Sequence, residues 1–137
     1  MNLKRRDREQ KIAVSCLLKR GNEVLLLRSS QALNEANYTH PGYFNLPRFY
    51  LNFGEDPEEL LRREFLDLFN QQIDELELLD VTQSRPDEYT HLVNIIYGGQ
   101  TDTDTAAVGK YMFTKIDELE NYAFPGELER IKRFLGF

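Results

Sequence analysis

Apolar residues near the start of the chain occur in two short runs that are typical of β-strands. Ile12–Leu18 and Glu23–Arg28 are rich in aliphatic residues, and Arg20-Gly21-Asn22 separates them. Gly and Asn readily adopt the positive φ angles that tight hairpin turns need. The pattern therefore predicts a β-hairpin at the beginning of the domain.

The next stretch is polar, and it gives way to a helix with a clear start. Ser29–Tyr43 has no regular pattern and predicts a long loop, and Phe44–Phe53 is a short apolar piece. Asp56 is suited to cap a helix, Pro57 fits the first helical position, and Glu59 follows three residues after the cap. These signals predict that a helix begins directly after Asp56.

The apolar positions of this helix follow a helical repeat. Leu61, Phe65 and Leu68 recur at i, i+4 and i+7, which predicts that all three lie on one buried stripe. Leu60 and Phe69 widen this stripe. Asn70 is a suitable helix end, because Asn adopts the left-handed conformation more readily than other residues with a side chain.

The remaining pattern alternates strands, a loop and helical turns. The expected elements are strands at Leu76–Thr82 and Leu92–Tyr97, a loop at Gly98–Gly109, a strand at Lys110–Phe113, a helical turn at Ile116–Leu119 and a last helix from Pro125 to near Leu135. This order predicts an α+β fold in which a mixed β-sheet has helices packed on its faces. We expect residues 1–137 to form a single domain.

Composition and charge argue against some classes of binding partner, and the absence of a signal-peptide pattern indicates the cellular compartment. Lys and Arg number 17 against 23 Asp and Glu, so the net charge of −6 argues against duplex nucleic acid and anionic membranes. No apolar run is long enough to span a membrane, and no signal-peptide pattern follows the basic start, so we expect a cytoplasmic protein. The single cysteine, Cys16, lies in an apolar run and is expected to be buried.

Acidic residues are concentrated around the start and middle of the predicted helix. Glu64 and Asp67 are three positions apart and share a helix face, and Glu55 lies just before the helix. Such carboxylates are the ligands that a hard divalent cation such as Mg²⁺ prefers. Arg63 is able to hold one of them in a bidentate ion pair. A solvated acidic helix face is the alternative, and composition alone leaves both open.

The spacing of these residues resembles the signature of the Nudix hydrolase family, G-x5-E-x7-R-E-U-x-E-E-x-G-U, in which U is apolar. The matched positions, in order, are Phe49 at the first Gly, Glu55 at the first Glu, Arg63-Glu64 at the Arg-Glu pair, Phe65 at the first U, Asp67 and Leu68 at the Glu-Glu pair, Asn70 at the last Gly and Gln71 at the last U. The hairpin, Leu46-Pro47 and the terminal strand and helix also fit, so the likeness covers nearly the whole chain.

The resemblance implies a mixed sheet between helices and hydrolysis of a nucleoside diphosphate linked to another moiety, with Mg²⁺ or Mn²⁺ held by box carboxylates. It implies that Glu64 is a primary metal ligand and Asp67 a second one. Glu55 would support the metal or its waters, and Arg63 would orient a box carboxylate.

Other candidates lie outside the helix. Many family members take a further acid from a late loop, where Asp102 and Asp104 stand in this chain. Arg48 is a candidate to grip phosphate directly, with a surface arginine as the alternative. Tyr50 is a candidate to stack on a nucleobase, with loop packing as the alternative.

The chain also departs from the signature in ways that affect chemistry. Leu68 cannot ligate a metal, and Arg48-Phe49 replaces the usual pair of glycines, so that loop must follow another path or pack differently. We therefore expect weakened hydrolysis. The alternative is a non-catalytic nucleotide-sensing or protein-interaction module on the same fold, and a homodimer is left open.

Overall fold

A seven-stranded mixed sheet forms the centre of the computed structural model, which describes residues 7–28, 44–103, 111–121 and 125–136. Its strands are β1 (Glu9–Arg20), β2 (Glu23–Arg28), β3 (Phe44–Asn45), β4 (Arg48–Tyr50), β5 (Glu75–Ser84), β6 (Thr90–Gln100) and β7 (Tyr111–Lys115). The strand order is β3-β2-β1-β6-β5, with β4 also beside β1 and β7 beside β2. β1 and β6 run parallel, whereas the other neighbouring strands are antiparallel.

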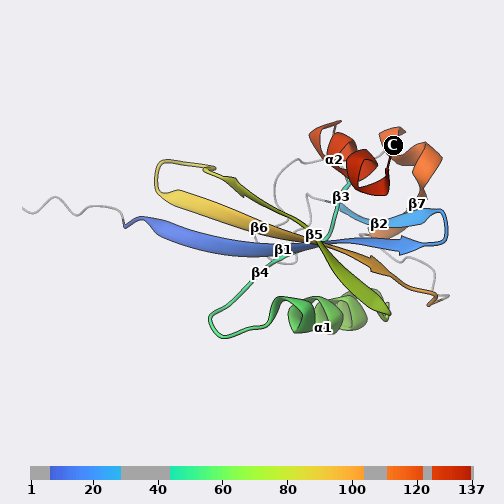
Figure 1. Ribbon diagram of the computed structural model, residues 1–137, viewed down its shortest axis with the longest axis horizontal. Helices are drawn as coiled ribbons and strands as arrows, with labels where there is room; N and C mark the ends of the chain where they lie inside the picture. Colours follow the sequence, from blue (N-terminus) through green and yellow to red (C-terminus); the bar gives the residue numbers. More distant parts are fainter. Residues whose placement is uncertain (1–6, 29–43, 104–110, 122–124, 137) are drawn as a thin grey trace, which may run out of the picture.

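Helices cover both faces of this sheet. The helix α1 (Pro57–Phe69) lies on one side, and the 3-10 helix η2 (Ile116–Asn121) and the helix α2 (Pro125–Leu135) lie on the other (Figure 1). Both predicted helices and the helical turn are confirmed. The arrangement confirms the expected α+β sandwich, with a mixed sheet between α1 and the C-terminal helix. No helix in the described residues is long and apolar enough to cross a membrane.

The first two strands form the predicted hairpin and divide the core into two layers. Gly21 turns the chain with φ of 59°, a conformation that costs glycine little. Side chains of β1 alternate between the faces: Cys16 lies in the cluster against α1, and Leu17 lies in the cluster against η2 and α2. Cys16 is fully buried, as expected, and this burial raises the pKa of its thiol.

One predicted boundary is wrong. The loop expected from Gly98 begins later, because β6 continues to Gln100. At Gly99 an added Cβ would lie 3.1 Å from Cγ2 of Ile73 and 3.2 Å from the carbonyl oxygen of Glu75. Glycine therefore marks a close approach within the sheet here, and not a turn. The predicted loop Ser29–Tyr43 lies outside the described residues.

Candidate functional site

The helix α1 begins and ends where its capping residues predict. The side chain of Asp56 accepts a hydrogen bond from the backbone N–H of Glu59 at 3.0 Å, and Pro57 is the first helical residue. Asn70 adopts the left-handed conformation with φ of 53° and ψ of 41°, and its N–H donates to the carbonyl of Leu66. Local chemistry therefore fixes both ends of the helix that carries most of the signature.

An aromatic cluster holds α1 against the sheet. The ring centroids of Phe65 and Phe69 are 5.1 Å apart, and Phe49 of β4 lies 6.1 Å from Phe65 and 6.4 Å from Phe69. All three side chains are buried. Phe49 thus fills the core at the position where the signature has its first glycine, which is the different packing that the sequence required.

The predicted burial of Leu68 is wrong. Its side chain is 38% exposed, whereas Leu61 and Phe65 are fully buried and Phe69 takes the third place in the core. The buried residues Leu61, Phe65 and Phe69 are spaced four apart, and each step of four residues advances about 40° around a helix. In the last turn this buried row therefore lies at Phe69, about 100° around the helix from Leu68. Leu68 therefore presents hydrocarbon to the surface of α1.

Glu55 is tied to the start of α1 through both of its carboxylate oxygens. Oε1 accepts from the backbone N–H of Asn52 at 2.8 Å, and Oε2 pairs with Arg63 at 2.8 Å. The hydrogen bond from Arg63, followed by the one from Asn52, lowers the pKa of Glu55, and the same pairing raises the pKa of Arg63. Arg63 also lies 3.5 Å from Glu64. The structure thus brings three signature residues together, with Arg63 between two carboxylates.

The other proposed metal ligands do not complete this group. Glu64 is partly buried, Asp67 is exposed, and Asp104 lies outside the described residues. Within the described ranges, no three His, Cys, Asp or Glu side chains lie together in a group that could hold a metal ion. With Leu68 supplying hydrocarbon and Glu55 bound to Arg63, the described residues do not form a Mg²⁺ or Mn²⁺ site by themselves.

Arg48 and Tyr50 lie on either side of Phe49 in β4. Because side chains alternate along a strand, these two residues point to the sheet face opposite to α1. Tyr50 also lines a groove of about 570 Å³ between the start of β1, Gln10–Ile12, and the segment Tyr50–Glu55. The Lys11 ammonium lies 5.0 Å from the centre of the Tyr50 ring. The groove brings Tyr50 and Glu55 together, whereas Glu64 and Asp67 are not among its lining residues.

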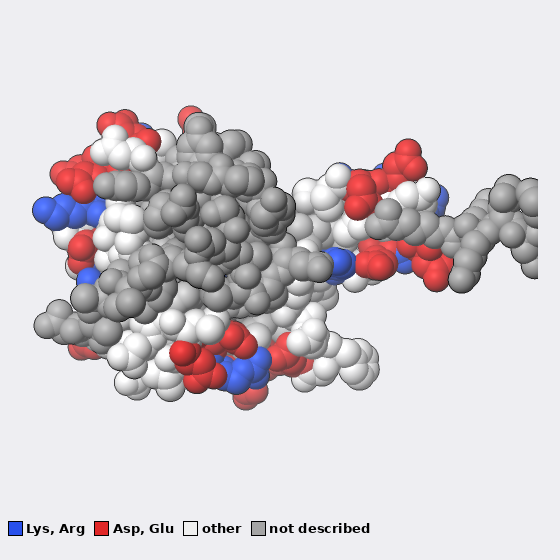
Figure 2. Space-filling model, turned by 180° about the vertical axis from the view of Figure 1, so that it is seen from behind, with Lys and Arg blue, Asp and Glu red and all other residues white. Residues whose placement is uncertain are grey.

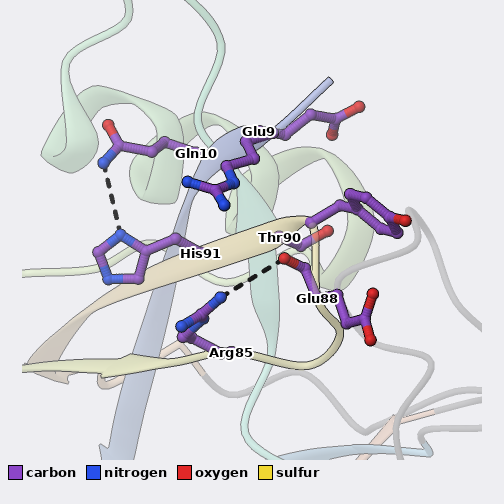
Figure 3. A pocket seen from close by; sticks show the side chains of 8 residues that line it. Glu9, Gln10, Arg85, Glu88, Thr90 and His91 are labelled. Atoms are coloured by element: carbon purple, nitrogen blue, oxygen red, sulfur yellow. Dashed lines mark hydrogen bonds between the residues drawn. The ribbon is translucent and has the colours of Figure 1, made fainter. Parts of the chain in front are cut away.

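Two hollows lie at the start of β1 that sequence reasoning missed. Phe53, on the wall of the groove, is fully exposed in a segment that was expected to be a simple apolar piece. A second hollow of about 340 Å³ adjoins Gln10 (Figure 3). There, His91 contacts Gln10 at 3.4 Å and Gln83 at 2.7 Å, and Arg85 donates to the carbonyl of Glu88 at 3.4 Å. No motif spacing predicts either hollow, because their residues come from strands far apart in sequence.

Comparison with known proteins identifies the fold. No family model matches the sequence. Among solved structures, the E. coli ORF135 protein superimposes with a TM-score of 0.68 at 14% identity, covering 93% of this chain and 90% of that one. The mutator MutT protein from Bacillus halodurans gives 0.67 at 18% identity, with 93% and 83% covered. A Nudix hydrolase from Nitrosomonas europaea gives 0.67 at 16% identity, with 93% and 89% covered.

This chain therefore has the fold of the Nudix hydrolases over nearly its whole length, as the spacing of its signature predicted. The likeness at this level of identity establishes the fold and leaves the activity and the ligand as separate questions.

Proposed function

We propose that this protein binds a nucleoside diphosphate linked to another moiety, and that its metal-dependent hydrolysis of the pyrophosphate bond is strongly weakened. The fold shared with a MutT protein and a Nudix hydrolase supports the class of ligand. The observation that carries the proposal is the exposed face of α1, where Glu64 and Asp67 stand beside Leu68 and no group of three possible metal ligands forms within the described residues.

Several residues would act on the ligand in this proposal. Arg48 would pair with a phosphate group, since a guanidinium binds phosphate in a planar, bidentate way. The ring of Tyr50 would stack on the base. Arg63 would act as a positioning residue, because its hydrogen bond holds Glu55 at the start of α1 and its charge lies beside Glu64.

A non-catalytic nucleotide-sensing module is the second candidate. The same missing ligand group favours it, together with the full use of the Glu55 carboxylate in contacts to Arg63 and Asn52. In that case the Nudix fold would supply a binding surface, and occupancy by the nucleotide would be the signal.

The test is a panel of nucleoside diphosphate derivatives with Mg²⁺ or Mn²⁺, on which product release and the melting temperature are measured together. We expect one class of ligand to raise the melting temperature and to be hydrolysed slowly. Turnover should be lost in Glu64→Gln and retained in Glu58→Gln, which makes the same chemical change at an exposed position of the same helix. A ligand that raises the melting temperature without any turnover establishes the sensing module. A panel with no shift and no turnover overturns both.

A further inference from the structure

The start of β1 has an open hydrogen-bonding edge. β1 pairs with β6 from Glu9 to Lys19, but on its other side β4 pairs only with Ala13–Ser15. The N–H of Leu51 donates to the carbonyl of Ile12 at 2.7 Å and extends that side by one residue. Within the described part of the chain, no strand pairs with this side of β1 before Ile12. The start of β1 projects from the body of the molecule beside β6 (Figure 1).

The hydrogen bonds along β1 show which backbone groups face this edge. Glu9 donates its N–H to Tyr89, on the β6 side, whereas Cys16 donates to Pro47 and Ile12 accepts from Leu51, on the β4 side. Peptide groups of successive residues alternate between the two sides of a strand. The N–H and C=O of Gln10 therefore face the open edge, and this edge borders the 570 Å³ groove.

The side chains around Gln10 carry a self-complementary charge pattern. Glu9 and Lys11 lie on the same sheet face, and their charged groups are 3.8 Å apart. The Gln10 side chain lies on the other face and contacts His91, and Glu9 points away from both (Figure 3). If a second copy of this strand lies antiparallel with Gln10 opposite Gln10, each Glu9 faces the second copy's Lys11. Acidic and basic side chains are interspersed on this projecting arm when it is seen from behind (Figure 2).

We propose that the start of β1 is a dimerisation edge, at which two copies of this chain pair antiparallel through Glu9–Lys11, with Gln10 opposite Gln10. A two-fold arrangement requires a surface that is complementary to itself, and the order Glu9-Gln10-Lys11 on an open strand edge provides one. The exposed ring of Phe53, on the wall of the groove, would be covered by the second copy's strand. The proposed nucleotide function does not enter the argument for this contact, although Tyr50, whose ring would stack on the base, also lines the groove.

The test uses charge reversal and sedimentation velocity over a concentration series of the full chain. We expect wild type to dimerise, and Lys11→Glu and Glu9→Lys each to raise the dimer dissociation constant at least about tenfold, because two cross-strand ion pairs become repulsive. An equimolar mixture of the two variants should form heterodimers, and the double variant Glu9→Lys/Lys11→Glu should dimerise again. Lys132→Glu and Glu129→Lys, exposed on α2, are controls with the same change in net charge.

Hydrogen exchange gives a readout of the backbone contact itself. The amide of Gln10 should gain protection as the protein concentration rises, whereas that of Glu9, which already bonds to Tyr89, should not change. A wild type that stays monomeric at all concentrations overturns the proposal. A dimer that survives both single reversals, or a Gln10 amide whose exchange is independent of concentration, overturns it equally. No measurement here uses a nucleotide, so the result does not depend on the proposed function.

Discussion

The buried and exposed faces of α1 differ in how fully they meet the requirements of the Nudix signature. On the buried face, Leu61, Phe65 and Phe69 pack against the sheet and are almost completely buried. On the exposed face, Glu64 and Asp67 stand beside Leu68 and do not form a metal-ligand group with other described residues. The positions that pack the core and the positions that the signature assigns to metal ligands thus lie on separate faces, and a sequence can meet the first requirement without the second.

Truncating the aromatic core of α1 is expected to have the largest effect. Phe65→Ala removes a fully buried ring in contact with Phe49 and Phe69, and we expect it to lower the free energy of unfolding by about 3–5 kcal/mol. Urea denaturation followed by circular dichroism measures this. Leu66→Ala, at a side chain that is 53% exposed, should change the value by no more than about 0.5 kcal/mol. Equal costs for the two variants would contradict the assignment of faces.

A carboxylate at position 68 tests whether the exposed face of α1 lacks a metal ligand there. Leu68→Glu adds a third acid beside Glu64 and Asp67, and we expect it to raise the affinity for Mn²⁺ about 10–100-fold, measured by calorimetry. The side chain at this position is 38% exposed, so the change should cost little stability. Leu66→Glu adds the same charge to the same helix at another position and should leave the affinity close to that of wild type. If both variants bind Mn²⁺ alike, the proposed ligand positions are wrong.

The Glu55–Arg63 pair at the start of α1 is expected to give the smallest effect. The pKa of Glu55 is lowered in the folded protein, so its contribution to stability is present above the pKa of an unfolded glutamate and is lost as the pH falls through the folded value. In Arg63→Gln this contribution should largely disappear. The difference in unfolding free energy between wild type and Arg63→Gln should therefore shrink between pH 6 and pH 3, values chosen to span the ordinary glutamate pKa of about 4.3.

A double-mutant cycle with Glu55→Gln assigns that pH dependence to the pair, because other acidic groups titrate in all four proteins. If the difference in unfolding free energy between wild type and Arg63→Gln stays constant between pH 6 and pH 3, or grows on acidification, the ion pair is not its cause. The pair is exposed, so added salt should also weaken it.

Local sequence signals determined the elements and both ends of α1. Asp56, Pro57 and Asn70 act through hydrogen bonds and backbone preferences within a few residues, so their effects can be predicted without knowing the rest of the fold. Two apolar runs with turn residues between them likewise predicted the hairpin, and the order of the expected elements predicted the mixed sheet between helices. The spacing of the signature predicted the Nudix fold, because its acidic and apolar positions describe one loop and one helix.

Only the tertiary structure decided whether Leu68 is buried, and which backbone edge at the start of β1 has no strand beside it among the described residues. Leu68 and Phe69 were both predicted on the buried stripe, but the sheet beneath the last turn buries Phe69 and leaves Leu68 partly exposed. The unpaired edge at Gln10 depends on where β4 ends and where β6 continues, and these strands are distant from it in sequence. Contacts of this kind are set by how elements meet in space, so no periodicity within a single segment specifies them.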